Sequence, residues 1–544
     1  MMRKGAFVSL IVLLGMAAAW AAQSQNPGSD VGEVSFANSG SAAAQQPFLR
    51  GLAQLHNFEF DSAAEEFRKA QSADANFAMA YWGEAMTYNH PLWAQQDLAA
   101  ARAVLQRLGS TPAARLAKAG TERERDFLRA IEVLYGEGSK EERDLKYADA
   151  MAAVHGKYPN DTEAAAFHAL ALLGTAHQGR DFTIYMRAAA ILQPLFYTHP
   201  RHPGVAHYLI HSFDDSIHAP LGLPAARSYS KIAAEAPHAQ HMTSHIFVAL
   251  GMWDDVVEAN EVAARVQDQQ NARRGLPPTV CGHYNIWLEY GYLQQGRMRD
   301  AKKVLGICRD AAVKSASTMN PSGAGGSLAG GYAQMWLRYL IDSDDWSGEV
   351  ARWPVPSGAN AAVKLTFDFA NGYGAVHRGD LKAAREALAA LPAASADSRA
   401  AMPGMGGMVG TGNATQQAYL DRGAILVQQL QAMIDAAEGR RDAAIALLQK
   451  TAAAEMAMAF EYGPPFIDKP AQELLGEFLL AANRPAEART AFEASLARAR
   501  ARTQSLLGLQ RAAKAAGDTK KADEMAAELR GIWRRADEVS PEIR

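Results

Sequence analysis

The chain has 544 residues, of which 49% are hydrophobic and 21% are charged, the proportions of a folded protein with a substantial core. Its formal net charge is −3, and its lysines and arginines form neither a basic arm nor a basic stripe, which excludes the usual electrostatic footprint of a nucleic-acid-binding protein. A chain of this length can form several ordinary domains or one long array of repeats.

The N-terminus has the pattern of an export signal. Arg3 and Lys4 precede an apolar segment over residues 6–16, which is too short to span a bilayer comfortably, and a small-x-small cleavage site ends at Ala21. An uncleaved membrane anchor is the alternative interpretation, and no later stretch is apolar enough to cross a membrane. We therefore expect residues 1–21 to be a signal peptide and the mature chain to lie in a bacterial periplasm.

Composition divides the rest of the chain into four segments. Ser, Gly, Ala, Asn and Gln dominate residues 22–44, which predicts a flexible leader. Beyond it, Ala, Leu, Glu, Gln and Arg recur in helix–turn–helix patterns, and nothing alternates like a strand. A Gly/Met-rich break over 396–416 separates a larger helical array over 45–395 from a smaller one over 417–544.

The helical region carries a repeated turn. A glycine or asparagine is followed five residues later by alanine and nine residues later by a large apolar residue. The first residue permits a tight turn, and the alanine allows the two flanking helices to approach closely. The examples are Gly296/Ala301/Leu305, Gly379/Ala384/Leu388, Gly439/Ala444/Leu448 and Asn483/Ala488/Phe492, with Gly517/Ala522 less complete.

This pattern resembles the tetratricopeptide repeat, a two-helix unit of about 34 residues that stacks into a solenoid. The stretch from Asn57 through Ala63 to Phe67 also resembles the turn and second helix of such a unit. The unit after Gly251 departs from the pattern, because Val256 and Asn260 stand where alanine and an aromatic residue are expected. The resemblance implies an all-α, right-handed solenoid of helical hairpins.

A narrower resemblance is to exported bacterial tetratricopeptide-repeat proteins. It is carried by the phrases Ala80-Tyr-Trp-Gly-Glu-Ala-Met86, His207-Tyr-Leu-Ile-His211 and Gly463-Pro-Pro465. We know no settled activity for that group, so the resemblance implies a fold and little chemistry. In the repeat family, the first helix of each pair lines a concave groove, where ligands usually bind.

Histidines are concentrated in one stretch, since nine of the fifteen fall between residues 199 and 283. Two pairs with helical spacing, His207/His211 and His241/His245, are separated by one full repeat period. His238 precedes the second pair by one helical step. Steps of three and four residues keep side chains on one face of a helix. The resemblance places this face in the groove, with His283 of the next unit in the place that His238 takes in its own.

This arrangement predicts a transition-metal site. Two imidazoles at i and i+4 can chelate one ion, and packed helices lie roughly 8–10 Å apart, so histidines of consecutive units can reach a shared ion. Zinc, copper and iron all accept imidazole ligands. Asp214, Asp215 and His218 follow the first pair and could complete or orient the ligand set. The candidate metal ligands are His207, His211, His238, His241, His245, His283, Asp215 and His218.

Other interpretations of the histidines stay open. The groove could bind a polar ligand such as a carboxylate without a metal, or the histidines could be purely structural. His168 and the pair Glu84 and His90 are weaker ligand candidates. A separate MxxMxxM run, at Met402, Met405 and Met408, is typical of copper(I) binding and equally of a flexible loop.

Cys281 and Cys308 are the two cysteines of the chain. In the repeat register, Cys281 begins one helix and Cys308 lies late in its antiparallel partner. A disulfide between them is feasible in an oxidising compartment, and two buried free thiols are the alternative.

Two functions follow from these patterns. The first is a periplasmic binding or scaffold protein whose groove holds a protein, peptide or small molecule, with a histidine-bound metal supplying specificity. The alternative is a metal-dependent enzyme whose ion activates water or oxygen, with Asp215 and Glu84 as candidate bases. A purely structural assembly factor of the cell envelope is a third possibility. No Gly-rich phosphate loop, GxSxG elbow or HExxH motif is present.

Overall fold

The computed structural model describes residues 30–317, 324–356, 361–398, 413–539 and 541–543. The expected signal peptide over 1–21 and the methionines Met402, Met405 and Met408 lie outside the described residues. Among those that are described, no helix combines the length and the apolar character needed to span a membrane.

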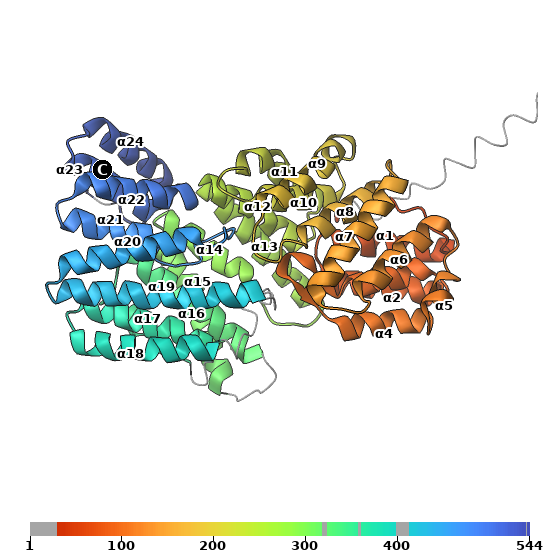
Figure 1. The fold of residues 1–544 in the computed structure, drawn as a ribbon, viewed down its shortest axis with the longest axis horizontal. Coiled ribbons are helices and arrows are strands. Elements are labelled where there is room, and N and C mark those ends of the chain that lie inside the picture. The colour runs from red at the N-terminus through yellow and green to blue at the C-terminus, as the bar shows by residue number, and fades with distance from the viewer. Residues whose placement is uncertain (1–29, 318–323, 357–360, 399–412, 540, 544) are drawn as a thin grey trace, which may run out of the picture.

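The first half of the described chain is a succession of helices (Figure 1). They are α1 (Ala42–His56), α2 (Phe60–Ala73), α3 (Ala78–Met86), α4 (Leu98–Leu108), α5 (Pro112–Leu116), α6 (Glu122–Leu134), α7 (Lys140–Lys157), α8 (Thr162–Leu173), α9 (Phe182–Thr198), α10 (Pro203–Phe213), α11 (Ala219–Ile232), α12 (Pro237–Leu250) and α13 (Trp253–Arg273). Between α3 and α4, the two-residue strands β1 (Asn89–His90) and β2 (Gln95–Gln96) pair antiparallel around the short helix η1 (Pro91–Trp93). This small hairpin is a departure from the prediction that nothing forms a strand.

The second half continues in the same way. Its helices are α14 (His283–Gln294), α15 (Met298–Ser317), α16 (Ala324–Ser343), η2 (Val350–Arg352), α17 (Ala361–His377), α18 (Leu381–Ser398), α19 (Asn413–Ala437), α20 (Arg441–Ala457), α21 (Ala471–Ala481), α22 (Pro485–Arg498), α23 (Thr503–Ala515), α24 (Thr519–Ile532) and η4 (Trp533–Arg535). α19 packs on both α17 and α18, so the helices on the two sides of the Gly/Met-rich break are in direct contact.

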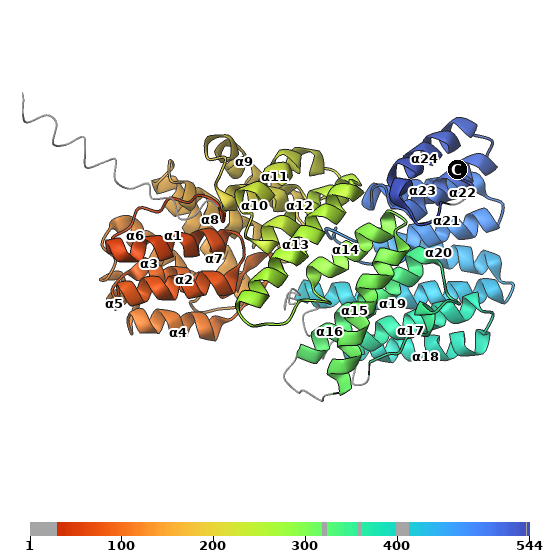
Figure 2. The same cartoon turned by 180° about the vertical axis from the view of Figure 1, so that it is seen from behind.

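Successive helices pair as hairpins, and alternate helices stack. α1 packs on α2, α12 on α13 and α21 on α22, while α10 packs on α12 and α21 on α23 across the hairpins. Figure 2 shows the same succession of stacked hairpins from behind. The structure is therefore an all-α array of helical hairpins of the tetratricopeptide type, as the turn pattern predicts.

The predicted turn residues adopt the left-handed backbone conformation that glycine and asparagine tolerate best. Their φ angles are 71° at Gly251, 68° at Gly296, 75° at Gly379, 87° at Gly439, 58° at Asn483 and 78° at Gly517. The alanines five residues later are buried, and four of them, Ala301, Ala384, Ala444 and Ala488, are fully buried. The pattern is confirmed, because small side chains at these positions let the paired helices meet.

Phe58 occupies the same turn position between α1 and α2, with a φ of 58°. Ala63 and Phe67 follow at the expected five and nine residues, and both are fully buried. A left-handed conformation costs a bulky residue roughly 1–2 kcal/mol, and such strain is commonly kept where the side chain is needed. The side chain of Phe58 lies against histidines of α10 and α12.

Part of the segment expected to be a flexible leader belongs to the packed structure. Val31 and Phe36 are buried, and Phe36 lies against Phe48, Trp82 and Phe127 of three helices. The backbone N–H of Glu33 donates to the carbonyl of a residue near the start of α10. Residues 31–41 therefore extend the core ahead of α1.

The C-terminal hairpins fold back onto the middle of the array. The Trp253 indole donates to the Ala501 carbonyl at 3.0 Å, and the Trp533 indole donates to the Gln294 carbonyl at 3.0 Å. In both views the C-terminal helices, in blue, lie beside α14, in green. The loop between α20 and α21, residues 458–470, is thereby brought against α14, and it covers the histidines described next.

Candidate metal site

Six of the predicted ligands come together at the centre of the array. His207 and His211 lie on α10, His238, His241 and His245 lie on α12, and His283 begins α14. They form two groups, each with ligand nitrogens within 4.8 Å of one another. The first trio is His207, His211 and His238, and the second trio is His241, His245 and His283.

The two trios are built in the same way. Each consists of a pair at i and i+4 on one helix and a third histidine from the first turn of the next helix in the stack. α10 and α12 both begin with a proline, at Pro203 and Pro237, where the missing N–H costs no helical hydrogen bond. The repeat therefore sets both the spacing within each pair and the alignment between helices.

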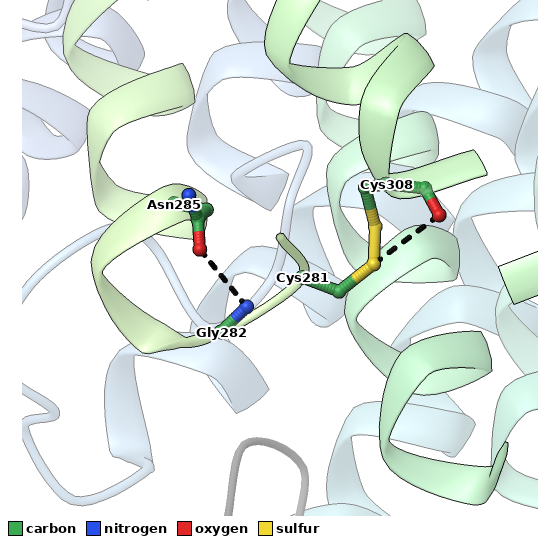
Figure 3. Close-up of a disulfide and its surroundings, with 4 residues drawn as sticks. All are labelled: Cys281, Gly282, Asn285 and Cys308. Atoms are coloured by element: carbon green, nitrogen blue, oxygen red, sulfur yellow. Dashed lines mark hydrogen bonds between the residues drawn. A yellow bond between two sulfur atoms is a disulfide. The ribbon is translucent and has the colours of Figure 1, made fainter. Parts of the chain in front are cut away.

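A disulfide fixes the helix that supplies His283. Cys281 and Cys308 are bonded with an S–S distance of 2.05 Å and Cα atoms 5.0 Å apart. Figure 3 shows the bond that joins Cys281, two residues before α14, to Cys308 of α15. It also shows the Gly282 N–H donating to Asn285 Oδ1, a hydrogen bond of 3.1 Å. The first turn of α14 is thus anchored on both sides.

Hydrogen bonds fix the Nδ1 atom of one histidine in each trio. His207 Nδ1 lies 2.7 Å from the His56 carbonyl oxygen, which can only accept. His241 Nδ1 lies 2.7 Å from Asn260 Oδ1, and the Asn260 amide nitrogen donates to the Val256 carbonyl at 2.8 Å. That second bond sets the amide orientation, so Asn260 also offers an acceptor. In both histidines, Nδ1 is the protonated nitrogen.

Asp214 holds one histidine of each trio. Its Oδ2 lies 2.9 Å from His245 Nδ1 and 3.3 Å from His211 Nδ1, and its Oδ1 accepts from Arg180 at 2.5 Å. Burial alone would raise the pKa of Asp214, but Arg180 and the two histidines outweigh it and hold that pKa well below its usual range. The carboxylate is therefore ionised and can only accept.

As a result, unprotonated nitrogens face one another. A neutral imidazole carries one N–H, and in His241 and His245 that hydrogen is on Nδ1. Their Nε2 atoms nevertheless lie 3.2 Å apart, lone pair toward lone pair. The first trio differs, because His238 Nε2 lies 3.2 Å from His207 Nε2 and can donate a hydrogen bond to it, but buried His211 Nε2 has no hydrogen-bond partner among the described residues. Two nitrogens bound to one tetrahedral ion at about 2.1 Å are about 3.4 Å apart.

Burial favours the neutral form of five of these imidazoles, those of His207, His238, His241, His245 and His283. The five histidines of α10 and α12 are at most 4% exposed. Burial lowers the pKa values of His207, His238 and His241 well below 6.5, and it lowers those of His245 and His283 to about 4 and about 3. Neutral imidazole is the form that binds metal, so no proton has to leave these rings at pH 7.

Aromatic side chains enclose the histidines. The imidazole of His245 stacks with the rings of both Trp287 and Tyr462. The ring centroids lie 4.6 Å apart for Trp287 and 4.7 Å apart for Tyr462. A Cβ at Gly463 would come within 2.3 Å of the Trp287 ring, so only glycine lets the 458–470 loop lie this close. Phe58 contacts His207 at 4.3 Å. The histidines therefore do not lie on an open surface, because residues 458–470, far away in sequence, pack against His245 and Trp287.

A cavity of about 220 Å³ adjoins this enclosure. Tyr462 and Trp93, which contact the histidines, form part of its wall, together with Arg180 and Glu461. Glu461 is exposed as a residue, but the protein packed around its carboxyl group raises the pKa of that group to about 7. The cavity thus offers room for a small molecule one side chain away from the trios.

Asp215 and His218 lie outside both trios. His218 Nδ1 donates to the Asp215 carboxylate at 2.9 Å, and Arg180 also pairs with Asp215 at 3.0 Å. The backbone N–H groups of Ile217 and His218 donate to the same carboxylate. These partners orient both residues away from the histidine nitrogens, so the structure does not bring them to the predicted site.

The weaker candidates also have other partners. Glu84 is paired with Arg68 and Arg107. His90 stacks on Phe60 with ring centroids 3.9 Å apart, and His168 lies against His155. None of these residues belongs to either trio.

A third group, which the sequence did not suggest, joins His56, Glu163 and His202. His56 Nε2 and His202 Nε2 lie 2.7 and 3.1 Å from the two oxygens of Glu163. The remaining ring nitrogens are bonded to the Tyr208 hydroxyl and the Val205 N–H. Because every ring nitrogen has a protein partner, this group is a complete hydrogen-bond network that needs no ion.

Of the residues that complete the two trios, sequence reasoning missed His56, Phe58 and Tyr462 and did not assign a role to Asn260. The sequence does contain a signal for Asn260, because asparagine stands there at a position where the repeat pattern has an aromatic residue. Tyr462 directly precedes the Gly463-Pro-Pro465 phrase, but nothing in the sequence places that phrase beside α12.

No protein-family model matches the chain, and no curated protein matches it in sequence. Similar solved structures include the Cut9–Hcn1 hetero-tetramer of the APC/C (12% identity, 92% of this chain and 78% of that chain, TM-score 0.32) and a human IFIT1 dimer with PPP-AAAA (11%, 91% and 91%, 0.30). The P58(IPK) TPR domain is another (12%, 88% and 100%, 0.21). The function of this chain therefore has to be argued from its own residues.

Proposed function

We propose that this chain binds a transition-metal ion among the histidines of α10, α12 and α14. The observation that carries the proposal is the facing pair of His241 Nε2 and His245 Nε2, 3.2 Å apart. Asn260 and Asp214 take the hydrogens of the two Nδ1 atoms. A cation between the two Nε2 atoms replaces their repulsion with two bonds.

A proton is the other cation that could lie between them, and burial opposes it. The pKa of His245 is lowered to about 4 and that of His241 falls well below 6.5, so an imidazolium is disfavoured at neutral pH. A metal ion does not depend on this protonation. Ligand sets made of imidazoles suit zinc, copper and iron.

The surroundings of the site bear on what else the protein binds. The 458–470 loop covers His245 through Tyr462, so a protein or peptide partner, expected from the groove of the repeat family, would bind another surface of the array. A small molecule fits the cavity of about 220 Å³ beside Tyr462. We therefore favour a metal-binding protein with a small-molecule ligand over a peptide-binding scaffold.

This same cavity favours a metal-dependent enzyme as the second candidate. An ion held by three imidazoles keeps an open position for water or oxygen. Glu461 lines the cavity, and its pKa of about 7 suits a general base at neutral pH. Asp215 and Glu84, the bases expected from the sequence, are engaged in ion pairs with arginines.

The proposed location is an oxidising compartment, the bacterial periplasm. The N-terminal pattern of an export signal motivates this, and the Cys281–Cys308 disulfide supports it because structural disulfides persist mainly outside the cytosol.

The direct test is elemental analysis of the protein purified without a metal-affinity tag, before and after incubation with Zn²⁺, Cu⁺ and Fe²⁺. We expect at least one bound equivalent of one of these ions. Less than about a tenth of an equivalent under every condition would overturn the proposal, since a site with preformed neutral ligands should fill when the ion is supplied.

The matched variant replaces both His241 and His245 with asparagine. The asparagine amide nitrogen can take the place of Nδ1 and keep the bonds to Asn260 and Asp214, while Nε2 is removed. We expect this variant to lose the ion that His241 and His245 bind, together with the thermal stabilisation that this ion gives. His218→Asn, which makes the same change outside the trios, is the control and keeps the wild-type metal content. A metal content in the double variant equal to that of the wild type would contradict the proposal.

A further inference from the structure

We propose that the cluster holds two metal ions, one in each trio, linked through Asp214. This inference rests on the proposed function, because it concerns the same histidines. It goes further in assigning His207, His211 and His238 to one ion and His241, His245 and His283 to the other.

The first argument is that the trios are equivalent by repetition. His207 and His241, one repeat period apart, each donate Nδ1 to an oxygen that only accepts. His211 and His245, separated by the same period, both direct Nδ1 to the same oxygen of Asp214. Corresponding histidines therefore present corresponding Nε2 atoms. If one trio is a ligand set, the other has the same construction.

The second argument is the number of donors. Each trio supplies three nitrogens within 4.8 Å of one another, which is the usual number of protein ligands for a transition-metal ion with one open position. A single zinc ion takes four ligands, so it would leave two of the six imidazoles unused. One of those left behind would be a buried nitrogen such as His211 Nε2, which has no hydrogen-bond partner among the described residues. Two ions use all six.

The third argument concerns Asp214 as the link. His211 belongs to the first trio and His245 to the second, and their rings are 5.5 Å apart at the centroids. Their shared carboxylate is fixed by Arg180 on its other oxygen. Loading one trio should therefore position the ligand of the other through Asp214. Carboxylates that orient metal-bound histidines typically affect metal affinity by about 10–100-fold.

Charge identifies the more suitable ion. None of the six imidazole ligands is an anion, and Asp214 and Asp215 with Arg180 supply one net negative charge nearby. Two divalent ions would bring four positive charges into a buried site, whereas two copper(I) ions bring two. Because uncompensated buried charge is costly, the site favours copper(I) over zinc.

The test is a titration of the full-length wild-type chain with Cu⁺ under anaerobic conditions, and separately with Zn²⁺, followed by elemental analysis and native mass spectrometry. We expect two bound copper ions per chain, and no more zinc than copper. His238→Ala and His283→Ala should each retain one ion, their combination should retain none, and His218→Asn should retain two.

Each other outcome has a definite meaning. One ion in the wild type, lost in both single variants, would overturn the two-ion inference and leave the proposed function standing. No ion in the wild type would overturn both. Because the wild-type stoichiometry needs no substitution, a variant that fails to fold cannot hide the answer. Two ions in the wild type with two still present in His283→Ala would place the second ion elsewhere and also contradict the inference.

Discussion

Two of the buried polar clusters in this array of hairpins differ in how their charges and lone pairs are matched. In the Arg502 cluster, the guanidinium at the start of α23 donates to Glu473 of α21 at 2.8 Å and to Asp342 of α16 at 2.5 Å. Ser505 also donates to Glu473. In the histidine cluster, by contrast, acceptors face acceptors.

The difference separates a structural role from a ligand-binding one. Buried polar groups in folded proteins nearly always have partners. The Arg502 cluster pairs opposite charges from helices that are far apart in sequence, which is what joining the C-terminal hairpins to the middle of the array requires. The facing nitrogens of His241 and His245 cannot be partners for each other in their neutral state. The proposed cation would match the lone pairs of the second cluster, whereas the first cluster already pairs opposite charges within the protein.

The largest effect is expected from breaking the Arg502 cluster. Arg502→Met leaves the buried Asp342 without its cation and the buried Glu473 with Lys469 alone, and breaking a buried ion pair typically costs about 3–5 kcal/mol. We expect the free energy of unfolding in urea to fall by about that amount. Metal content should not change. A loss below about 1 kcal/mol would contradict a structural role for this ion pair.

Lowering the pH should reduce the stability that the Arg502 cluster contributes, and it should do so over a defined pH range. Burial alone would raise the pKa of Glu473, but Arg502 and Lys469 outweigh it and lower that pKa to about 2 from the usual 4.5. A lowered carboxyl pKa contributes stability that is present above about pH 4.5 and is lost as the pH falls toward 2. The contribution is about 3 kcal/mol when complete.

Comparing wild type with Glu473→Gln isolates this contribution from those of other groups. The stability difference between the two proteins, measured by urea unfolding, should shrink as the pH is lowered from 4.5 to about 2.5. A difference that stays constant over that range would show that Glu473 does not titrate with a lowered pKa.

Loss of the disulfide should weaken metal binding at the second trio more than at the first. Cys281 lies two residues before His283, the first residue of α14, and the bond closes a separation of 27 residues. Replacing both cysteines with serine should lower stability by about 3 kcal/mol through the unfolded chain. Affinity should fall for one of the two ions and stay unchanged for the other, which calorimetric titration resolves. Equal weakening of both would show that the disulfide has only a general stabilising effect.

The fold could be predicted from sequence because its signals are local. Gly296 and Gly439 each form a turn, an alanine five residues later lets the two helices approach closely, and a large apolar residue nine residues later is buried. All three features lie within a short stretch of sequence. Phe58 is instructive, since its alanine and phenylalanine partners keep the spacing while the turn residue itself is one that rarely adopts φ of 58°. A search for glycine or asparagine therefore passes over it.

The ligands could be predicted only where helical spacing and the repeat period place them. Those rules align α10 with α12 and α12 with α14, so that His207 lies beside His238 and His241 lies beside His283. They say nothing of the covering loop, because Tyr462 reaches α12 through the return of the C-terminal hairpins. Proximity in sequence was a poor guide to the ligand set. Asp215 closely follows the first histidine pair, but it is held by Arg180.

The smallest effect is expected from substitutions of Asn260. They distinguish a residue that orients the metal ligand His241 from one that serves only packing. Asn260→Leu keeps a side chain of similar size but removes the acceptor for His241 Nδ1. The imidazole can then carry its hydrogen on Nε2, where the ion must bind, so affinity for one ion should fall by about 10–100-fold. Asn260→Asp keeps an acceptor at this place and should bind nearly as well as wild type. The two variants, compared by competition against a chelator of known affinity, give opposite results if Asn260 sets the protonation of His241 and the same result if it serves only packing. Loss of affinity confined to one ion would also show that the departure from the repeat pattern at this position serves the second trio.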